Sequence, residues 1–173
     1  MSILIPVVST GITLNEVPDK VAFYVELGEC TQHCAGCHSP HLWEPVAHKT
    51  TLEDLQAMAD EAVDKGANAI VLMGGTANGL SMEDLIKVIN GLEDIAPTCL
   101  YSGVDNMDVN RYIAEHSQLT WIKTGSYKEE LGGITSPTSN QRFFRKEYEY
   151  RIEHFMYPKV SSVLVDCTHL FRK

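Results

Sequence analysis

Three of the five cysteines lie in one short segment, Cys30-Thr-Gln-His-Cys34-Ala-Gly-Cys37, with a C-x3-C-x2-C spacing. Thiolates this close together indicate a metal site, because they are good ligands for zinc and for iron. The spacing leaves two possibilities open. One is a tetrahedral zinc site completed by His33, His38 or His41, and the other is a 4Fe–4S cluster. A cubane cluster with three thiolates would leave one iron without a protein ligand, open to a substrate.

The cysteine segment follows a predicted strand. Residues 21–27 are rich in β-branched and aromatic side chains, which favour a strand, and residues 29–49 form a turn-rich loop. A helical pattern starts at Thr50, with Thr50 and Glu53 in capping-box positions, and Gly66 marks its end. The cysteines therefore belong to the loop at the carboxyl end of the first predicted strand.

Strands and helices then alternate along the chain. Further strands are predicted at 69–73, 98–101 and 119–123, with helices after Ser81 and near 108–114. After a long loop over 125–140, only 161–165 is predicted to form another strand. Strand–helix alternation indicates an α/β fold of mainly parallel strands, and the length of 173 residues predicts a single domain over residues 1–173.

Parallel strands bring their carboxyl ends to one edge of the sheet. The cysteine loop, Gly74-Gly75, Ser102-Gly103 and Thr124-Gly125 each follow one of the four predicted strands. We expect them to meet at that edge, where open α/β sheets and α/β barrels bind their ligands.

The net charge of the chain and the two cysteines outside the motif help to exclude some classes of function. The formal net charge of −9 argues against nucleic-acid binding, which would be expected to bring clustered Lys and Arg. No apolar run approaches the roughly 20 residues that a membrane-spanning helix needs. With no secretory signal visible, we expect a cytoplasmic protein with reduced thiols. Cys99 lies within a predicted strand and Cys167 has no metal-spaced partner, so core packing is expected for both.

The cysteine motif resembles the signature of the radical S-adenosylmethionine superfamily, which lies in the loop after the first strand of a partial (β/α) barrel. The resemblance implies that Cys30, Cys34 and Cys37 ligate a 4Fe–4S cluster and that S-adenosylmethionine chelates the open iron. Reductive cleavage of S-adenosylmethionine would then give a radical that abstracts a hydrogen atom. No catalytic residue is implied beyond the cluster ligands.

Two further segments resemble one branch of the superfamily, the activating proteins of anaerobic ribonucleotide reductase. They are His33–Trp43, which has Gly36 where many members have an aromatic residue, and Gly132–Arg142, which ends in Asn-Gln-Arg. This branch generates a glycyl radical on the anaerobic ribonucleoside-triphosphate reductase. The resemblance implies that reductase as the protein substrate and a flavodoxin-like or other low-potential carrier as the electron donor.

The resemblance also implies which residues contact S-adenosylmethionine. The Gly-Gly after the second strand corresponds to the superfamily's Gly-Gly-Glu or Gly-Gly-Asp motif, with Thr76 in place of the acid, so ammonium binding falls to the backbone near Gly74. The expected binding residues are Gly36, Cys37, His38, Gly74, Gly75 and Ser102. Capping of the following segment is an equal alternative for Ser102.

Other functions stay open on the sequence alone. The same chemistry could act on another glycyl-radical enzyme or on a small molecule, and a non-enzymatic Cys3His zinc module is the third possibility. The segment Arg142–Arg151 interleaves basic and aromatic residues, but Glu147 and Glu149 interrupt it. We therefore expect it to dock on a protein partner and not on RNA.

Overall fold

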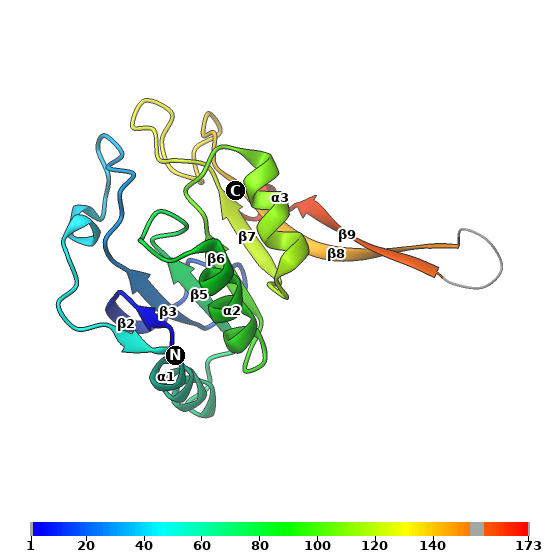
Figure 1. Ribbon diagram of the computed structural model, residues 1–173. Coiled ribbons are helices and arrows are strands. Elements are labelled where there is room, and N and C mark those ends of the chain that lie inside the picture. The colour runs from blue at the N-terminus through cyan, green and yellow to red at the C-terminus, as the bar shows by residue number, and fades with distance from the viewer. Residues whose placement is uncertain (1, 153–157, 173) are drawn as a thin grey trace.

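The computed structural model describes residues 2–152 and 158–172 and has a mixed α/β architecture. A seven-stranded sheet has the order β2-β3-β5-β6-β7-β8-β9, and a small two-stranded sheet joins β1 to β4. Figure 1 shows the α-helices packed on one side of the large sheet. The strands are β1 (Leu4–Ile5), β2 (Val7–Thr13), β3 (Ala22–Leu27), β4 (Thr50–Thr51), β5 (Ala69–Met73), β6 (Thr98–Tyr101), β7 (Trp121–Thr124), β8 (Arg142–Ile152) and β9 (Pro158–Asp166).

The four central strands, β3, β5, β6 and β7, are parallel, as the alternation of strands and helices predicts. The bounds of β5 and β6 agree with the predicted ranges, whereas β7 begins two residues later than predicted, at Trp121. The carboxyl ends of these strands therefore meet at one edge of the sheet. The open sheet has β2 and β9 at its edges, so the partial barrel stays a prediction.

The helices are α1 (Leu52–Asp64), α2 (Met82–Glu93) and α3 (Met107–His116). Ser81 caps α2 as predicted, but the predicted cap of α1 at Thr50 is wrong. Thr51 is the cap, and its hydroxyl accepts a hydrogen bond of 3.1 Å from the Asp54 amide. Thr50 instead pairs with Ile5 in the two-stranded sheet, which fixes it in extended backbone.

The two faces of the sheet are packed differently. Alternate strand residues such as Ile70, Leu100 and Ile122 pack under the helices. The opposite face is covered by loops and by the short 3₁₀ helix η2 (Thr168–Phe171), and its core includes Cys99, which is buried as expected, with Cys167 packed against it. The second 3₁₀ helix, η1 (Pro40–Trp43), lies in the cysteine loop. No described helix is both long and apolar enough to cross a membrane.

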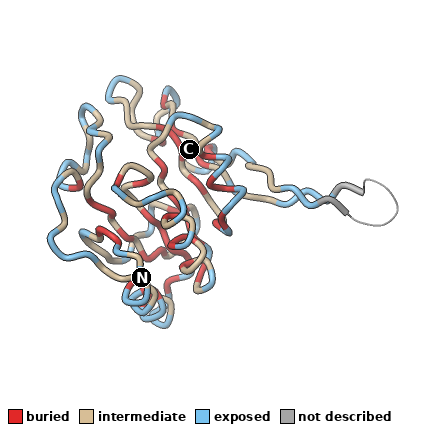
Figure 2. The backbone as a smooth tube through the Cα atoms, in the orientation of Figure 1, coloured by how far each residue is buried: buried red, intermediate tan, exposed pale blue. Residues whose placement is uncertain are grey.

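The sequence did not predict the antiparallel strands β2 and β8, and it predicted only the centre of β9. Only Arg142–Arg145 of β8 pair with β7, and the rest of β8 pairs with β9 alone. The two strands form an arm that leaves the body of the molecule in Figure 1, and most of its described outer part is exposed in Figure 2. The pattern of β8 has no apolar run, because charged and aromatic residues alternate there.

Candidate active site

A pocket of about 420 Å³ opens at the carboxyl edge of the parallel strands. The loops after β3, β5, β6 and β7 all contribute to its wall. Of the site residues expected from the sequence, those that line it are Cys30, Cys34, Cys37, His38, Gly74 and Ser102. Gly36 and Gly75 do not line it, and their contact with S-adenosylmethionine stays a prediction. The edge of the sheet thus brings together residues that are more than 70 positions apart.

The base of the cysteine loop is closed by Glu29. This residue has a positive φ of 59°, and its carboxylate accepts hydrogen bonds from the Val46 amide at 3.2 Å and from the Lys49 ammonium at 2.9 Å. The bond from Lys49 is the main reason that the pKa of Glu29 lies below its ordinary value. The Cys30 amide also donates to the Leu42 oxygen at 2.8 Å. Both ends of the loop are therefore tied together around the cysteines.

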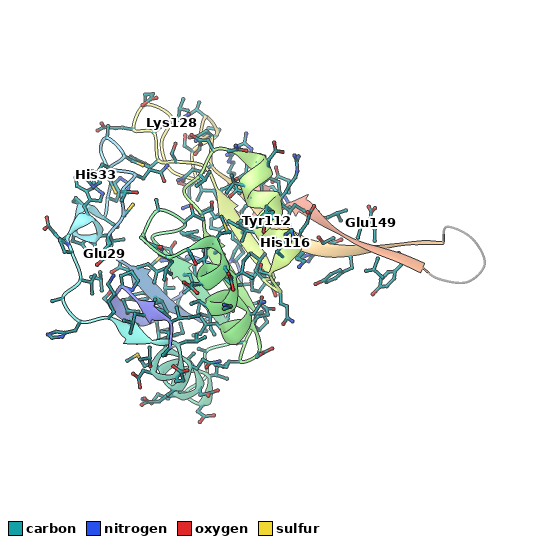
Figure 3. The ribbon with its side chains drawn as sticks, viewed as in Figure 1. Glu29, His33, Tyr112, His116, Lys128 and Glu149 are labelled. Carbon is teal, nitrogen blue, oxygen red and sulfur yellow. The ribbon has the colours of Figure 1, made fainter. Side chains whose placement is uncertain are left out.

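Two hydrogen bonds tie the cysteine loop to its neighbours along the sheet. The Thr31 amide donates to the Ala77 oxygen at 2.8 Å, in the loop after β5. The Gln32 side-chain amide donates to the Gly103 oxygen at 2.5 Å, in the loop after β6. The position of the three thiols is thus set by the parallel sheet as well as by their own loop. Figure 3 shows Glu29 and His33 on the side of the molecule where this loop lies.

Hydrogen bonds within the cysteine loop hold the last cysteine of the motif. The Cys37 amide donates to the Cys34 oxygen at 3.1 Å, and the Cys37 sulfur accepts a hydrogen bond of 3.4 Å from the Ser39 amide. Among the described residues, no three histidine, cysteine or acidic side chains converge on a point where one metal ion could bind.

The Gly-Gly pair after β5 allows a close approach of three strands. A Cβ at Gly74 would lie 2.2 Å from the Leu27 oxygen, and a Cβ at Gly75 would lie 2.3 Å from the Ser102 oxygen. Both residues also have positive φ values, of 99° and 63°. Any side chain here would push the end of β3 and the loop after β6 away from β5.

Two hydroxyls at this edge already have protein partners. Thr76, at the position where the resemblance implies an acid, donates through its hydroxyl to the Ser102 oxygen at 3.0 Å. The Ser102 hydroxyl donates to Asn110 Oδ1 at 2.5 Å and accepts from the Val104 amide at 3.3 Å. Thr76 thus joins two loops, and the capping role considered for Ser102 is observed. A contact between Ser102 and S-adenosylmethionine stays a prediction.

Three polar residues of the pocket were missed at the sequence level. The Tyr101 hydroxyl lies 2.5 Å from the Glu16 backbone oxygen and 2.7 Å from its carboxylate, and the Lys123 ammonium lies 4.2 Å from the centre of the Tyr101 ring. Burial lowers the pKa of Lys123 and raises that of Tyr101. Tyr101 and Lys123 lie on the sheet face away from the helices, which strand alternation could have indicated. No local signal marks Glu16.

A family comparison decides between the two metal sites that the spacing allows. Residues 19–132, more than half of the chain, match the model of the 4Fe–4S single cluster domain. The chain belongs to this cluster-domain family. The matched range contains all three cysteines of the motif and the four parallel strands. Membership of the cluster-domain family favours an iron–sulfur cluster over zinc.

A curated relative was also found. The chain is 30% identical over 95 residues to a 7-carboxy-7-deazaguanine synthase of Prochlorococcus marinus. The match covers 51% of this chain and 42% of the synthase, so the chain spans less than half of that relative. No solved structure matches the chain significantly.

Proposed function

We propose that this chain is a radical S-adenosylmethionine enzyme that generates a glycyl radical on the anaerobic ribonucleoside-triphosphate reductase. The observation that carries the proposal is one pocket that joins the three cysteines of the motif to Gly74, at the carboxyl edge of the parallel strands. Membership of the cluster-domain family and the likeness to a deazaguanine synthase support the cluster chemistry. The His33–Trp43 and Gly132–Arg142 segments support the choice of reductase.

The chain's own residues would hold the cluster and its ligand. Cys30, Cys34 and Cys37 would bind three irons, and the backbone beside Gly74 would bind the methionyl ammonium. When bound, the cluster supplies the electron that cleaves S-adenosylmethionine reductively, and the cleavage yields the species that abstracts hydrogen. The Ser39 amide, which donates to Cys37 Sγ, would help to orient that ligand.

The β8–β9 arm supports a protein as the substrate. Tyr148 and Tyr150 are 54% and 71% exposed, and Val160, which pairs with Tyr150, is 51% exposed. Exposed tyrosines side by side are typical of protein interfaces. We propose that this face of the arm contacts the reductase, and that the segment of the reductase that carries the reacting glycine enters the pocket. A flavodoxin-like carrier would supply the electron.

The deazaguanine synthase supports a second candidate, a radical S-adenosylmethionine enzyme that acts on a small molecule. Because the match covers only 42% of the synthase, it bears on the shared cluster chemistry and not on the substrate. The two candidates differ in one measurable property. A small-molecule enzyme would release 5′-deoxyadenosine when a metabolite is added without the reductase.

The test is anaerobic reconstitution with iron and sulfide, followed by dithionite, S-adenosylmethionine and the reductase. The expected result is the electron paramagnetic resonance doublet of a glycyl radical on the reductase. Cys34→Ala should abolish cluster retention and the doublet, whereas Cys167→Ala, outside the motif, should keep both. A reduced cluster that responds to S-adenosylmethionine but gives no doublet would contradict the choice of reductase. Tightly held zinc and no iron would contradict the cluster chemistry altogether.

A further inference from the structure

An aromatic pair lies beside the last cysteine of the motif. The rings of His38 and Tyr127 have their centroids 4.7 Å apart and are inclined by 48°. Both residues line the pocket together with Cys37. His38 follows Cys37 in the chain, whereas Tyr127 comes from the loop after β7, 89 positions later. Because the rings are inclined, their faces do not cover one another as they would in a parallel stack.

The loop that carries Tyr127 is held from the loop after β6. Asp105 accepts hydrogen bonds from the Ser126 amide at 3.0 Å, from the Ser126 hydroxyl at 2.8 Å and from the Asn140 side chain at 3.0 Å. Burial raises the pKa of Asp105, but the bonds from Ser126 and the nearby Lys128 outweigh it, so the pKa lies below its ordinary value. The carboxylate is therefore ionised at neutral pH. It fixes the residue that precedes Tyr127.

Asn140 completes this attachment. Its side-chain amide also donates to the Ser126 oxygen at 3.0 Å, so the Asn-Gln-Arg segment braces the same turn. Gln141, next in that segment, lines the pocket and donates to the Gly125 oxygen at 3.3 Å. Gly125 and Ser126 are thus held on both sides. The Asn-Gln-Arg segment therefore holds the start of the loop that carries Tyr127 at the pocket.

The same loop also covers the position of Gly36. A Cβ at Gly36 would lie 2.8 Å from Cδ of Glu129, and the φ of Gly36 is 68°. A side chain at this position would adopt a strained backbone conformation, and the Glu129 side chain would have to move to make space for it. The loop after β7 occupies that space and presents an aromatic ring, that of Tyr127, two residues before Glu129.

We propose that Tyr127 supplies, beside His38, an aromatic surface for the purine base of S-adenosylmethionine, and that Asp105 is the residue that positions Tyr127. This inference rests on the proposed function, because it concerns the same ligand. A planar base stacks on aromatic side chains through its π face, and the two rings offer such faces within the pocket that holds Cys37. Tyr127 provides an aromatic surface that Gly36, with no side chain, does not.

The experiment measures binding to the reconstituted, cluster-loaded protein under anaerobic conditions. Equilibrium dialysis gives the Kd of S-adenosylmethionine and of 5′-deoxyadenosine, which has the base but no amino-acid group. Tyr127→Leu keeps an apolar side chain but has no π face, so the Kd of both ligands should rise about tenfold. Tyr127→Phe should bind both as the wild type does.

Tyr112→Leu is the matched control. Tyr112 is also stacked on a histidine, His116, at 4.0 Å, but it lies on α3, 47% exposed and outside the pocket wall. Figure 3 shows this pair on α3, away from His33 and the cysteine loop. The control should leave both Kd values unchanged. Iron content is measured for every variant, so that cluster loss is not mistaken for loss of base binding.

The role of Asp105 is tested in a double-mutant cycle. Asp105→Ala should weaken 5′-deoxyadenosine binding in the wild type and add no further loss in the Tyr127→Leu background. Additive losses would overturn the positioning role.

Two outcomes separate this inference from the proposed function. If S-adenosylmethionine fails to bind the wild type or to change the spectrum of its reduced cluster, the proposed function and this inference both fall. If the wild type responds and Tyr127→Leu, with full iron content, binds both ligands equally well, only this inference is overturned.

Discussion

The Gln32 side chain reaches across the edge of the sheet and donates a 2.5 Å hydrogen bond to the Gly103 oxygen. This bond joins the loop of the cysteines to the loop after β6 without using any metal ligand. Its loss should therefore affect how firmly the cluster is held and leave the ligand set intact.

Gln32→Leu should release iron faster than the wild type. A hydrogen bond contributes about 0.5–1.5 kcal/mol net, so the rate of iron loss to a chelator should rise by roughly two- to tenfold. Gln56→Leu is the control, because Gln56 makes the same kind of bond, 2.8 Å to the Gly91 oxygen, away from the pocket. The control should lose similar stability and keep its iron. Equal release rates in the two variants would contradict the role of Gln32.

Gly75→Ala should be strongly destabilising. The added Cβ would lie 2.3 Å from the Ser102 oxygen in a backbone with positive φ. Gly66→Ala isolates the backbone effect, because Gly66 has a φ of 110° with no atom within 4 Å of an added Cβ. In urea unfolding, Gly75→Ala should lower the free energy of unfolding by roughly 1–3 kcal/mol more than Gly66→Ala. Similar losses would show that the close approach of the two loops is unimportant.

Asn110→Ala should loosen the loop after β6. Its side chain accepts from the Ser102 hydroxyl and donates to the Val104 and Asn106 oxygens at 2.9 and 3.0 Å, all from a buried position. The free energy of unfolding should fall by about 1–3 kcal/mol, because buried polar groups lose their partners. Asn110→Asp keeps the acceptor and removes the donors, and it should still be less stable than the wild type. Hydrogen exchange of the Val104 amide reports the loosening directly, and unchanged protection would argue against it.

Lys123→Met should change the pH dependence of stability. The folded pKa of Lys123 lies below its ordinary 10.5, with burial as the main cause, so the unfolded chain binds more protons between these two values. The stability contributed by Lys123 therefore rises as the pH increases through that window. The free energy of unfolding of the wild type minus that of the variant should increase from pH 7 toward 10.5. A constant or decreasing difference, measured by urea unfolding at several pH values, would contradict the lowered pKa.

The sequence predicted the central strands well because each is a short apolar run with a glycine or serine after it. β5 and β6 agree with their predicted bounds for this reason. The cap of α1 could not be chosen from the pattern, because Thr50 and Thr51 each have an acid three residues later. Tertiary pairing of Thr50 with Ile5 decided it.

The remaining differences come from contacts between distant residues. β2 and β8 lie outside the parallel core and have no apolar run, so local patterns did not reveal them. Tyr101 meets Glu16 across 85 positions, and only the folded sheet brings them together. Strand ends predict where a ligand site lies more readily than they predict which polar groups line it.

The three cysteines span only eight residues, whereas the rest of the pocket wall is contributed by loops scattered from Glu16 to Gln141. Thiols this close in sequence need no sheet to come together, so we expect a newly made chain to bind iron or zinc already. We therefore expect metal capture and enclosure of the metal by the pocket to be separate steps, and refolding in the presence of iron or of zinc would show whether their order decides which metal is held.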